Sequence, residues 1–248
     1  MVSERALVTT DGLPRGDVGF PEGYRALVIG ASGTIGQAFH DFLLNDPRCG
    51  SVSALSRKSH SGFDLESPQD FKDVVAALSP KAPFDLVIDA TGVLVMGGQG
   101  PEKSLKALNP EQLDRYFRIN ATGPLLLLQA LEPHLAQGPS CYAKLSARVG
   151  SISDNRLGGW YGYRASKAAL NMLLQTAAIE FQRTRPRMRV LALQPGTVRS
   201  PLSAPFTRQG HEVIEAKTSV QGLMKAIQTV SEGAGAAFVD YRGLSIDW

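Results

Sequence analysis

Short apolar runs alternate with longer segments of helical periodicity along almost the whole chain, and this alternation constrains the fold more than any other feature. The apolar runs are typical of strands and stand at 25–29, 52–55, 85–88, 142–146, 189–193 and 236–239. The segments between them space their apolar residues like one face of a helix, at 35–44, 68–78, 110–131, 161–181 and 220–230. Strands that alternate with helices build a mostly parallel sheet with helices on both faces. We therefore predict an α/β, doubly wound fold.

The chain is expected to form one domain preceded by an arm. Glycine, proline and charged residues break any periodicity over residues 1–24, so this segment is predicted to be an N-terminal arm. Residues 25–248 carry the alternation without a linker or a repeat. A chain of 248 residues with 43% apolar residues is long enough to bury one large core, so 25–248 is predicted to be a single domain.

The composition argues against several classes of protein. Lys and Arg number 26 against 23 Asp and Glu, and the net charge of +3 is not gathered in a basic tract, so nucleic-acid binding has no support. The two cysteines, Cys49 and Cys141, are too few for a disulfide framework or for a zinc site of four cysteines, so we expect a reducing compartment and no metal site. Charged residues interrupt the N-terminal segment, and no stretch approaches about 18 consecutive apolar residues. We expect no membrane contact and a cytoplasmic location.

A glycine-rich turn joins the first predicted strand to the first predicted helix. The residues placed there to contact a ligand are Gly30, Ser32, Gly33, Thr34, Ile35 and Gly36. Backbone N–H groups and the positive end of the helix dipole can meet a phosphate at such a turn, and glycine permits positive φ and close approach. An ordinary tight turn is the alternative, but the strand-turn-helix context favours a bound dinucleotide. The doubly wound fold is therefore predicted to be of the Rossmann type.

Ser56, Arg57 and Lys58 follow the second predicted strand, where a side chain faces the adenosine ribose in this topology. An acidic residue at this place would bond the ribose 2′-hydroxyl and favour NAD. Two cations suit a 2′-phosphate instead, and a guanidinium can hold a phosphate with two hydrogen bonds. The alternative is an ordinary solvated loop. We predict NADP as the cofactor, with NAD less favoured.

Tyr163 and Lys167 are four residues apart in a predicted helix and so share one of its faces. A phenol ionises near pH 10, but an ammonium about 4 Å away contributes on the order of 4 kcal/mol at an effective dielectric of 20. At about 1.36 kcal/mol per unit, this would bring the pKa of Tyr163 close to 7 and make it a proton donor and acceptor for a carbonyl and its alcohol. Taken alone, the pair also suits an amphipathic helix whose lysine lies in water.

Together these segments resemble the short-chain dehydrogenase/reductase family, and within it the carbonyl-reductase-like group that includes the C-factor signalling proteins. The likeness runs from Ala26 to Trp248. Its landmarks, in chain order, are the glycine turn, Asp64-Leu65, Asp89-Ala90-Thr91-Gly92, Arg118-Ile119-Asn120, Tyr163 with Lys167, and Pro195-Gly196-Thr197-Val198. The resemblance implies that Asp64 and Leu65 lie on the adenine side of the cofactor and that the turn from Pro195 to Val198 lies beneath the nicotinamide.

The family resemblance also implies roles in catalysis. Tyr163 would be the acid/base, Lys167 would hold the ribose and lower the pKa of Tyr163, and Asn120 would hold a water for proton relay. On its own, Asn120 lies inside an otherwise apolar helix, where an amide has poor propensity and must be hydrogen-bonded if it is buried. A structural kink at Asn120 is the alternative reading.

The sequence departs from the family pattern at the catalytic serine. The position three before Gly150, where the family carries a serine that orients the substrate, holds Ala147. We place the role on the adjacent Ser146, although neighbouring side chains of a regular strand point to opposite faces, and Ser151 is a further candidate. Losing one donor to a developing oxyanion typically costs about 10²–10³ in rate. Asp89 and Ala90 also replace asparagines that the family uses to tie neighbouring strands and the cofactor together.

These features predict an NADP(H)-dependent oxidoreductase that transfers hydride between the nicotinamide and a small carbonyl or alcohol substrate. The family implies a homodimer or homotetramer. One alternative is an NAD(P)-binding signalling or regulatory protein with weak or no catalysis, because the fold alone does not prove an activity and Ala147 replaces the serine. An epimerase-like relative, suggested by the glycine spacing, is a further alternative.

Overall fold

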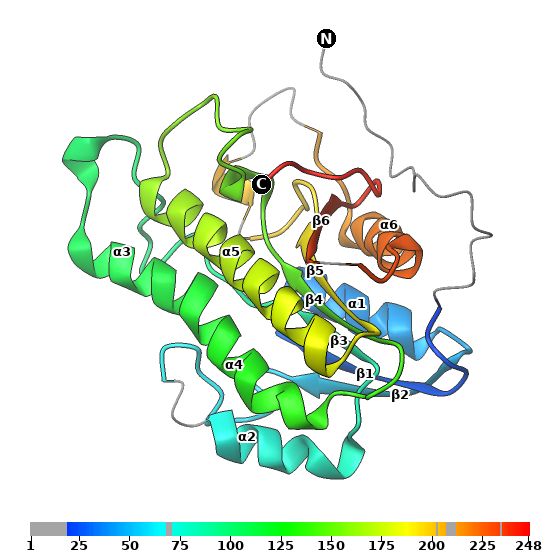
Figure 1. Cartoon of the computed structure of the whole chain (residues 1–248). Helices are drawn as coiled ribbons and strands as arrows, with labels where there is room; N and C mark the ends of the chain where they lie inside the picture. The colour runs from blue at the N-terminus through cyan, green and yellow to red at the C-terminus, as the bar shows by residue number, and fades with distance from the viewer. Residues whose placement is uncertain (1–18, 68–70, 202, 207–211, 234) are drawn as a thin grey trace.

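The apolar runs form strands that lie side by side in one parallel sheet. The structure, a computed structural model, describes residues 19–67, 71–201, 203–206, 212–233 and 235–248. Within these ranges the strands form a six-stranded sheet in the order β2-β1-β3-β4-β5-β6, with every neighbouring pair parallel (Figure 1). The strands are β1 (Tyr24–Ile29), β2 (Cys49–Leu55), β3 (Leu86–Asp89), β4 (Ser140–Leu145), β5 (Met188–Gln194) and β6 (Ala237–Asp240).

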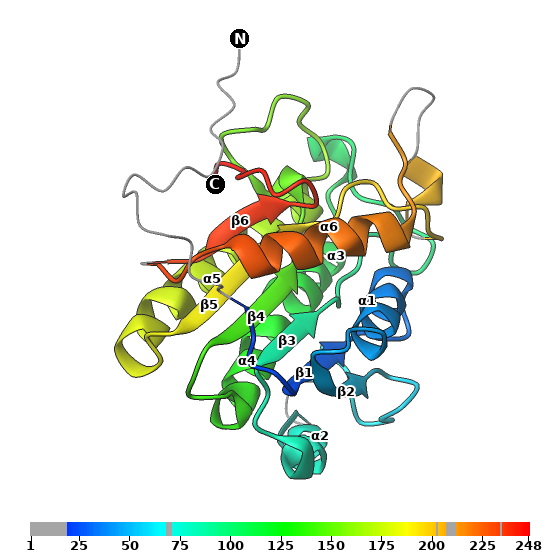
Figure 2. The same ribbon diagram turned by 90° about the vertical axis from the view of Figure 1, so that its right-hand side faces the viewer.

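Helices cover both faces of the sheet, so the predicted α/β, Rossmann-type doubly wound fold is confirmed. One face carries α1 (Thr34–Leu44) and α6 (Ala216–Thr229), which are in front in Figure 2. The other face carries α2 (Phe71–Leu78), α4 (Gly123–Leu131) and α5 (Tyr161–Thr184), which are in front in Figure 1. Helix α3 (Pro110–Phe117) precedes α4 and packs against α5. Short 3₁₀ turns lie at Ser79–Lys81, Leu105–Ala107, Glu132–His134, Arg148–Gly150 and Ala204–Phe206.

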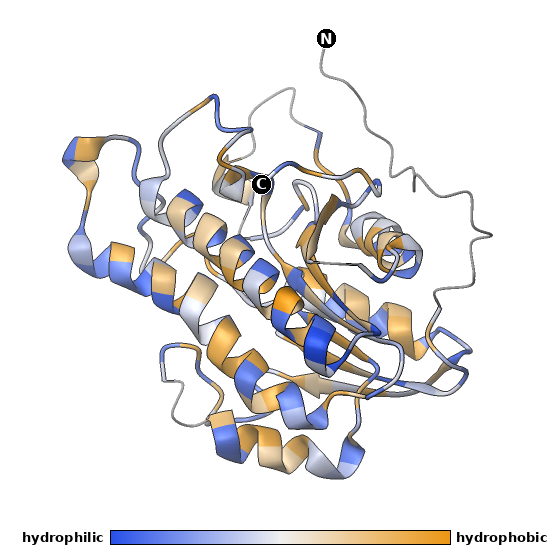
Figure 3. Ribbon diagram, in the orientation of Figure 1, coloured by the Kyte–Doolittle hydropathy of each residue, from blue (hydrophilic) through white to orange (hydrophobic). Residues whose placement is uncertain are grey.

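The alternation of side chains along the strands divides the core into two layers. In β1, Leu27 and Ile29 belong to the cluster under α2, α4 and α5, whereas Ala26 and Val28 belong to the cluster under α1 and α6. Both sets are buried because helices cover each face, which is why the strand reads as a continuous apolar run. Figure 3 shows apolar residues along the strands and a mixture of polar and apolar residues along the helices.

The predicted helix over 110–131 is not continuous. A π-helical segment, Arg118–Thr122, separates α3 from α4, and the amide of Gly123 bonds the carbonyl oxygen of Arg118. The other predicted elements agree with the structure to within a few residues. The first residues of the predicted helix 68–78 lie outside the described residues, and the predicted helix 220–230 begins earlier, at Ala216.

Most of the predicted N-terminal arm, residues 1–18, lies outside the described residues. The end of the segment belongs to the fold, because Phe20 is buried against the α1 and α6 layer and Tyr24 begins β1. The rings of Phe20 and Tyr24 lie 5.1 Å apart.

The order of the strands fixes where a ligand can bind. From β1 the chain passes to β2 on one side and then returns to β3 on the other side. The loops after β1 and β3 therefore separate at the carboxyl edge of the sheet, and ligands of open α/β sheets bind in the crevice at such a point. The glycine turn follows β1 and the turn at Ala90 follows β3, so the sequence places its two cofactor segments on either side of this point.

Candidate active site

The glycine turn and the turn after β3 touch at the carboxyl edge of the sheet. Gly30 has a φ of 80°, and a Cβ there would lie 3.1 Å from the carbonyl carbon of Ala90 and 3.2 Å from the amide nitrogen of Thr91. A Cβ at Gly36 would lie 2.2 Å from the carbonyl oxygen of Gly30, which no side chain can occupy. Glycine is therefore required at both positions for α1 to start directly against the end of β1.

The first turn of α1 presents free backbone donors. The amides of Thr34, Ile35 and Gly36 make no hydrogen bond with a described residue, and Gly33 caps the helix without a side-chain bond. Ser32, Gly33 and Thr34 are exposed. Unpaired N–H groups at the positive end of a helix dipole fit a phosphate. The predicted residues of the turn thus form a cradle that fits the diphosphate of a dinucleotide.

A pair of unpaired cations lies beyond the end of β2. Ser56 and Ser59 bond each other's backbone and hydroxyl groups, and this compact turn presents Arg57 and Lys58 to solvent. Neither cation makes a hydrogen bond or ion pair with a described residue. The pKa of Glu66 is lowered chiefly by its hydrogen bond with Arg115, and the charge of Arg57 makes a small further contribution in the same direction. Two free cations at this edge fit an additional phosphate group.

Asp64 and Leu65 follow this turn and lead toward α2. Leu65 is buried in the core, and its carbonyl oxygen lies 2.8 Å from the Cβ position of Gly123, at the start of α4. The carboxylate of Asp64 accepts a hydrogen bond from the amide of Glu66 at 3.0 Å through one oxygen.

Tyr163 and Lys167 lie on the same face of α5, as their spacing predicts. The Nζ atom of Lys167 is 5.8 Å from the centre of the Tyr163 ring and donates a hydrogen bond to the carbonyl oxygen of Leu145 at 3.2 Å. Lys167 is buried, whereas Tyr163 is half-buried and its hydroxyl makes no hydrogen bond with a described residue. A Cβ at Gly92 would lie 3.3 Å from Nζ of Lys167, so the turn after β3 adjoins the pair.

The expected lowering of the tyrosine pKa is not found in the protein alone. Burial, with a smaller contribution from Tyr116, raises the pKa of Tyr163 above its ordinary value. Burial also lowers the pKa of Lys167 from 10.5 to about 7, and the charge of Lys144 adds to this effect. The sequence-based estimate assumed a fully charged ammonium about 4 Å from the phenol. In the structure, the removal of each group from water is the largest cause of its pKa shift.

Asn120 fixes the turn after β3 to the helical layer. Its Oδ1 accepts the amide of Val93 at 2.8 Å, and its Nδ2 donates to the carbonyl oxygen of Val93 at 3.0 Å and to Oγ of Ser166 at 3.3 Å. The residue is fully buried in the π-helical segment. The helix is interrupted at Asn120, as the structural alternative predicts. The Oδ1 atom of Asn120 and Nζ of Lys167 each lie 3.3 Å from the Cβ position of Gly92, and the role of Asn120 in proton relay stays a prediction.

The two candidate serines have partners within the protein. The Ser146 hydroxyl donates to Oδ1 of Asn171 at 2.6 Å and is buried. Ser151, also buried, accepts the amide of Asp154 at 3.1 Å and lies 3.3 Å from the Ser153 hydroxyl. In this arrangement the hydrogen of Ser146 is committed to α5, so a role toward substrate requires it to leave Asn171.

The turn from Pro195 to Val198 closes the edge after β5. Gly196 has a φ of 78°, and a Cβ there would lie 2.9 Å from the ring of Tyr241. The carbonyl oxygen of Pro195 accepts the Ser219 hydroxyl at 2.6 Å, and Val198 is buried. These contacts hold the predicted segment at the same edge as the glycine turn.

Aromatic rings surround Tyr163 in an arrangement that the motifs did not reveal. Tyr116 and Trp160 meet its ring edge-on at 5.9 and 6.0 Å, and Phe206 meets Trp160 at 5.2 Å. Trp160 has a φ of 55°, in the left-handed region that a bulky residue rarely adopts.

Glu102 holds the start of α5 and was missed from the sequence. Its carbonyl oxygen accepts the amide of Trp160 at 2.5 Å, and its Oε2 accepts the amide of Gly162 at 3.1 Å. Its other carboxylate oxygen is buried without a hydrogen-bond partner among the described residues. A carboxylate at a helix N-terminus interacts favourably with the dipole. No spacing rule connects Glu102 with a helix that begins about 60 residues later.

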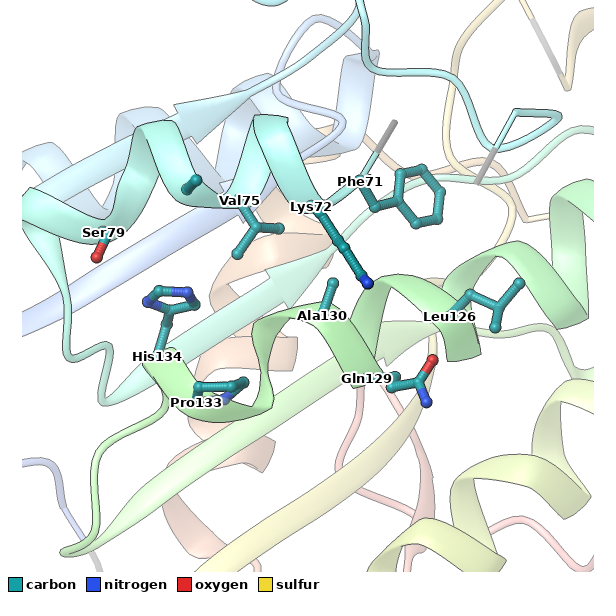
Figure 4. A pocket seen from close by; sticks show the side chains of 10 residues that line it. Phe71, Lys72, Val75, Ser79, Leu126, Gln129, Ala130, Pro133 and His134 are labelled. Carbon is teal, nitrogen blue, oxygen red and sulfur yellow. The ribbon is translucent and has the colours of Figure 1, made fainter. Parts of the chain in front are cut away.

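A separate groove of about 880 Å³ lies between α2 and α4 (Figure 4). Phe71, Lys72 and Val75 of α2 face Leu126 and Ala130 of α4 across it. None of the predicted site residues lines this groove. We therefore place the chemistry at the carboxyl edge.

Membrane-spanning helices and metal-binding clusters are both absent from the described residues. Across those residues no helix is both long enough and apolar enough to cross a membrane. The described ranges also contain no group of three or more His, Cys, Asp or Glu side chains arranged to hold a metal ion.

Comparison with known sequences identifies a family and several relatives. The short chain dehydrogenase family matches residues 25–211. C-signal of Myxococcus xanthus is 33% identical over 168 residues, which cover 67% of this chain and 93% of that protein. The 1-hydroxy-2-glutathionyl-2-methyl-3-butene dehydrogenase of a Rhodococcus species is 30% identical over 190 residues, covering 75% of this chain and 79% of that protein.

Solved structures share the fold. The NADPH-bound carbonyl reductase from chicken fatty liver has a TM-score of 0.79 at 23% identity, over 92% of this chain and 100% of that one. The carbonyl reductase Sniffer of D. melanogaster has a TM-score of 0.77 at 20% identity, over 91% of this chain and 99% of that one. At these identities the likeness establishes the architecture.

Proposed function

The chain belongs to the short-chain dehydrogenase family and is an oxidoreductase, and on this premise we propose that it is an NADP(H)-dependent reductase of small carbonyl compounds. The observation that carries the proposal is a meeting of three distant segments at one edge of the sheet. The unpaired amides of the glycine turn, the turn at Gly92 and the pair Tyr163 and Lys167 all lie there. This is where a dinucleotide and a carbonyl group would have to meet.

The cofactor is proposed to lie across the crevice between β1 and β3. The glycine turn would hold the diphosphate, Arg57 and Lys58 a 2′-phosphate, and Asp64 and Leu65 would lie near the adenine. Toward the other end, the residues beside the nicotinamide ribose and ring would be Ala90, Thr91, Gly92, Lys167, Pro195, Gly196 and Val198. When bound, the cofactor supplies the hydride. NADP is preferred over NAD because the two cations are free and no carboxylate follows β2 directly.

Tyr163 is proposed as the acid/base that gives its proton to the carbonyl oxygen during reduction. Among the residues that the structure describes, its hydroxyl has no hydrogen-bond partner, which leaves it available to a substrate. Lys167 would hold the ribose and, when protonated, favour the ionised phenol. Asn120 would hold a water for the return of protons from solvent. Ser146 stays the predicted donor to the developing oxyanion, on condition that its hydroxyl turns from Asn171.

The substrate is proposed to be a small, moderately apolar carbonyl or alcohol. Trp160 and Phe206 form an apolar wall beside Tyr163, and the strained backbone of Trp160 suggests that its position is used. The relatives named for a benzil reductase and for a dehydrogenase of a glutathionyl alcohol act on compounds of quite different size, so they do not narrow the class.

The decisive variant is Tyr163→Phe, compared with Tyr161→Phe. Both remove one phenolic oxygen from the first turn of α5, but Tyr161 is exposed and lies outside the site. We expect Tyr163→Phe to lower turnover by at least about 10²-fold with NADPH affinity nearly unchanged, because it removes a general acid. Tyr161→Phe should retain turnover. Binding is followed by NADPH fluorescence, and turnover by NADPH oxidation with a panel of aldehydes and ketones.

A binding protein with weak or no catalysis is the second candidate. Ala147 at the serine position favours it, as does the similarity to C-signal. Tight NADPH binding without turnover of any aldehyde or ketone would support this candidate and contradict the first. Turnover that is lost in Tyr163→Phe would exclude it.

The assembly is proposed to be a homodimer or homotetramer in the cytoplasm. Phe117, Leu126, Met172 and Ile179 leave apolar side chains exposed along α3, α4 and α5. Burying them against a second copy would remove this apolar area from water. Light scattering on the purified chain gives the mass, and a monomer at all concentrations would contradict the proposal.

A further inference from the structure

A buried ion pair ties the carboxyl end of β3 to β4. Asp89 and Lys144 are direct neighbours in the register of the two strands, and both side chains are completely buried. The ammonium of Lys144 donates to Oδ1 of Asp89 at 3.0 Å, to the carbonyl oxygen of Thr91 at 2.6 Å and to Oγ1 of Thr91 at 2.9 Å. All three of its donors are therefore used, and two of them hold the turn after β3.

The carboxylate of Asp89 is equally satisfied. It accepts the amide and the hydroxyl of Thr91 at 2.9 and 2.5 Å, and the Tyr142 hydroxyl at 3.0 Å. A buried ion pair adds little to the free energy of unfolding, because apolar residues of similar volume often give the same stability. What this pair secures is a definite geometry for Thr91 and Gly92, which lie beside the proposed active site.

Lys167 approaches the same turn from the helical layer. Its Nζ donates to the carbonyl oxygen of Leu145, the residue after Lys144, and lies 3.3 Å from the Cβ position of Gly92, the residue after Thr91. Two buried lysines thus lie beside the same turn, and the carboxylate of Asp89 supplies a negative charge next to their two positive charges. The pKa of Lys167 is lowered to about 7, chiefly by burial and in addition by the charge of Lys144, while the charge of Asp89 opposes both effects.

Among the described residues, the other groups near Lys167 do not supply a compensating charge. Tyr163 on the same helix and Tyr116 from α3 are phenols, and burial raises the pKa of both. Asn120 of the π-helical segment is neutral. Arg148 in the 3₁₀ turn that packs on α5 is exposed and pairs outward with Asp154 and Asp240.

We propose that Lys144 is a positioning residue for the reductase reaction: paired with Asp89, it fixes the turn from Ala90 to Gly92 and, as a second buried cation, opposes the positive charge of Lys167. This inference rests on the proposed function. Its consequence is that Lys167 exchanges its proton near neutral pH rather than near pH 10. The ability of Lys167 to hold the ribose and to favour an ionised Tyr163 would then decline as the pH rises through neutrality.

The test measures the titration of Lys167 directly in the cofactor-free protein. Lysine labelled with ¹³C at Cε is followed by NMR against pH, and the Lys167 signal is assigned by its loss in Lys167→Met. In Lys144→Gln the pKa of Lys167 should rise by on the order of 1 unit, because a like charge is removed and Asp89 is left to pair with Lys167. The alkaline limb of kcat/KM should move upward by the same amount.

Tyr142→Phe is the matched control. It removes one hydrogen bond to Asp89 from the same cluster but leaves both charges, so the titration of Lys167 should stay as in the wild type. The double variant Asp89→Asn with Lys144→Gln keeps the cluster neutral and hydrogen-bonded. The Lys167 pKa can therefore still be measured in this variant if Lys144→Gln alone does not fold. The Lys167 pKa should rise in the double variant too, but less than in the single variant.

An unchanged or lowered pKa of Lys167 in the folded Lys144 variants overturns the proposal, as does a rise in Tyr142→Phe equal to that in Lys144→Gln. These outcomes do not depend on turnover. If the wild type is inactive but the Lys167 pKa shifts as expected, the proposed reaction and the catalytic part of the inference are both overturned. If the enzyme is active but the Lys167 pKa does not shift in the variants, only the inference is overturned.

Discussion

Replacing Arg57 and Lys58 by alanine tests how the chain distinguishes NADPH from NADH. Both side chains are exposed at the end of β2 and make no hydrogen bond or ion pair with a described residue, so removing them should leave the fold intact. A hydrogen bond to a charged group contributes about 1.5–3 kcal/mol, and exposure to solvent and salt argues for the lower end of that range. With tenfold per 1.4 kcal/mol, each substitution should weaken NADPH binding about 10-fold and the double variant about 100-fold.

The assay compares NADPH with NADH by fluorescence titration at low and at high salt. NADH lacks the 2′-phosphate, so its affinity should change little in the same variants. The loss for NADPH should shrink at high salt because exposed charges are screened beyond about 8–10 Å at physiological ionic strength. Arg183→Ala is the control, since this exposed arginine lies about 30 Å along α5 from Tyr163.

Three results would refute the reasoning. The first is equal affinity of the wild type for NADPH and NADH. The second is a loss of NADH affinity in the variants by the same factor as NADPH affinity. The third is an equal loss of NADPH affinity in Arg183→Ala. Any of these would show that Arg57 and Lys58 belong to an ordinary solvated loop.

Three further predictions concern the same edge of the sheet. Gly36→Ala should lower both the melting temperature and NADPH affinity, because its Cβ would overlap the carbonyl oxygen of Gly30, whereas Gly138→Ala, with open space around its Cβ position, should have little effect in thermal unfolding. The predicted role of Ser146 requires Ser146→Ala to lower kcat by about 10²–10³-fold, and an unchanged kcat would remove Ser146 from the reaction. Lys167 has a pKa of about 7 in the folded protein against 10.5 in the unfolded chain, so the unfolded chain binds more protons between these values. The free energy of unfolding should therefore gain a contribution from Lys167 as the pH rises from about 7 toward 10.5, and urea denaturation of Lys167→Met should lack that rise.

The sequence predicted the parts of the molecule whose physics is local. Strand and helix periodicity located β1 to β6 and the major helices, because burial on both faces of a parallel sheet gives each strand an apolar run. The glycine spacing was sufficient to locate the turn between β1 and α1, and the interval between Tyr163 and Lys167 was sufficient to put both on one face of α5.

The electrostatics of the site depended on burial and on partners distant in sequence. No spacing shows that Lys144 and Asp89 are paired across two strands or that Lys167 is buried beside them, yet these facts decide which group holds a proton. The same limit applies to Ser146, whose partner Asn171 lies on another element, and to Glu102 at the start of α5. A charged residue inside an apolar strand, such as Lys144, was the available signal.

The π-helical turn at Arg118–Thr122 makes chain length at this point part of the site. One residue more than an α-helical turn separates α3 from α4, and each residue rotates a helix by about 100°. Deleting a single residue here would let α3 and α4 continue as one uninterrupted α-helix. Either the apolar side of α4 would then leave the sheet, or the amide of Asn120 would swing away from Val93. In a shortened variant of this chain, the deletion should therefore lie outside Arg118–Thr122.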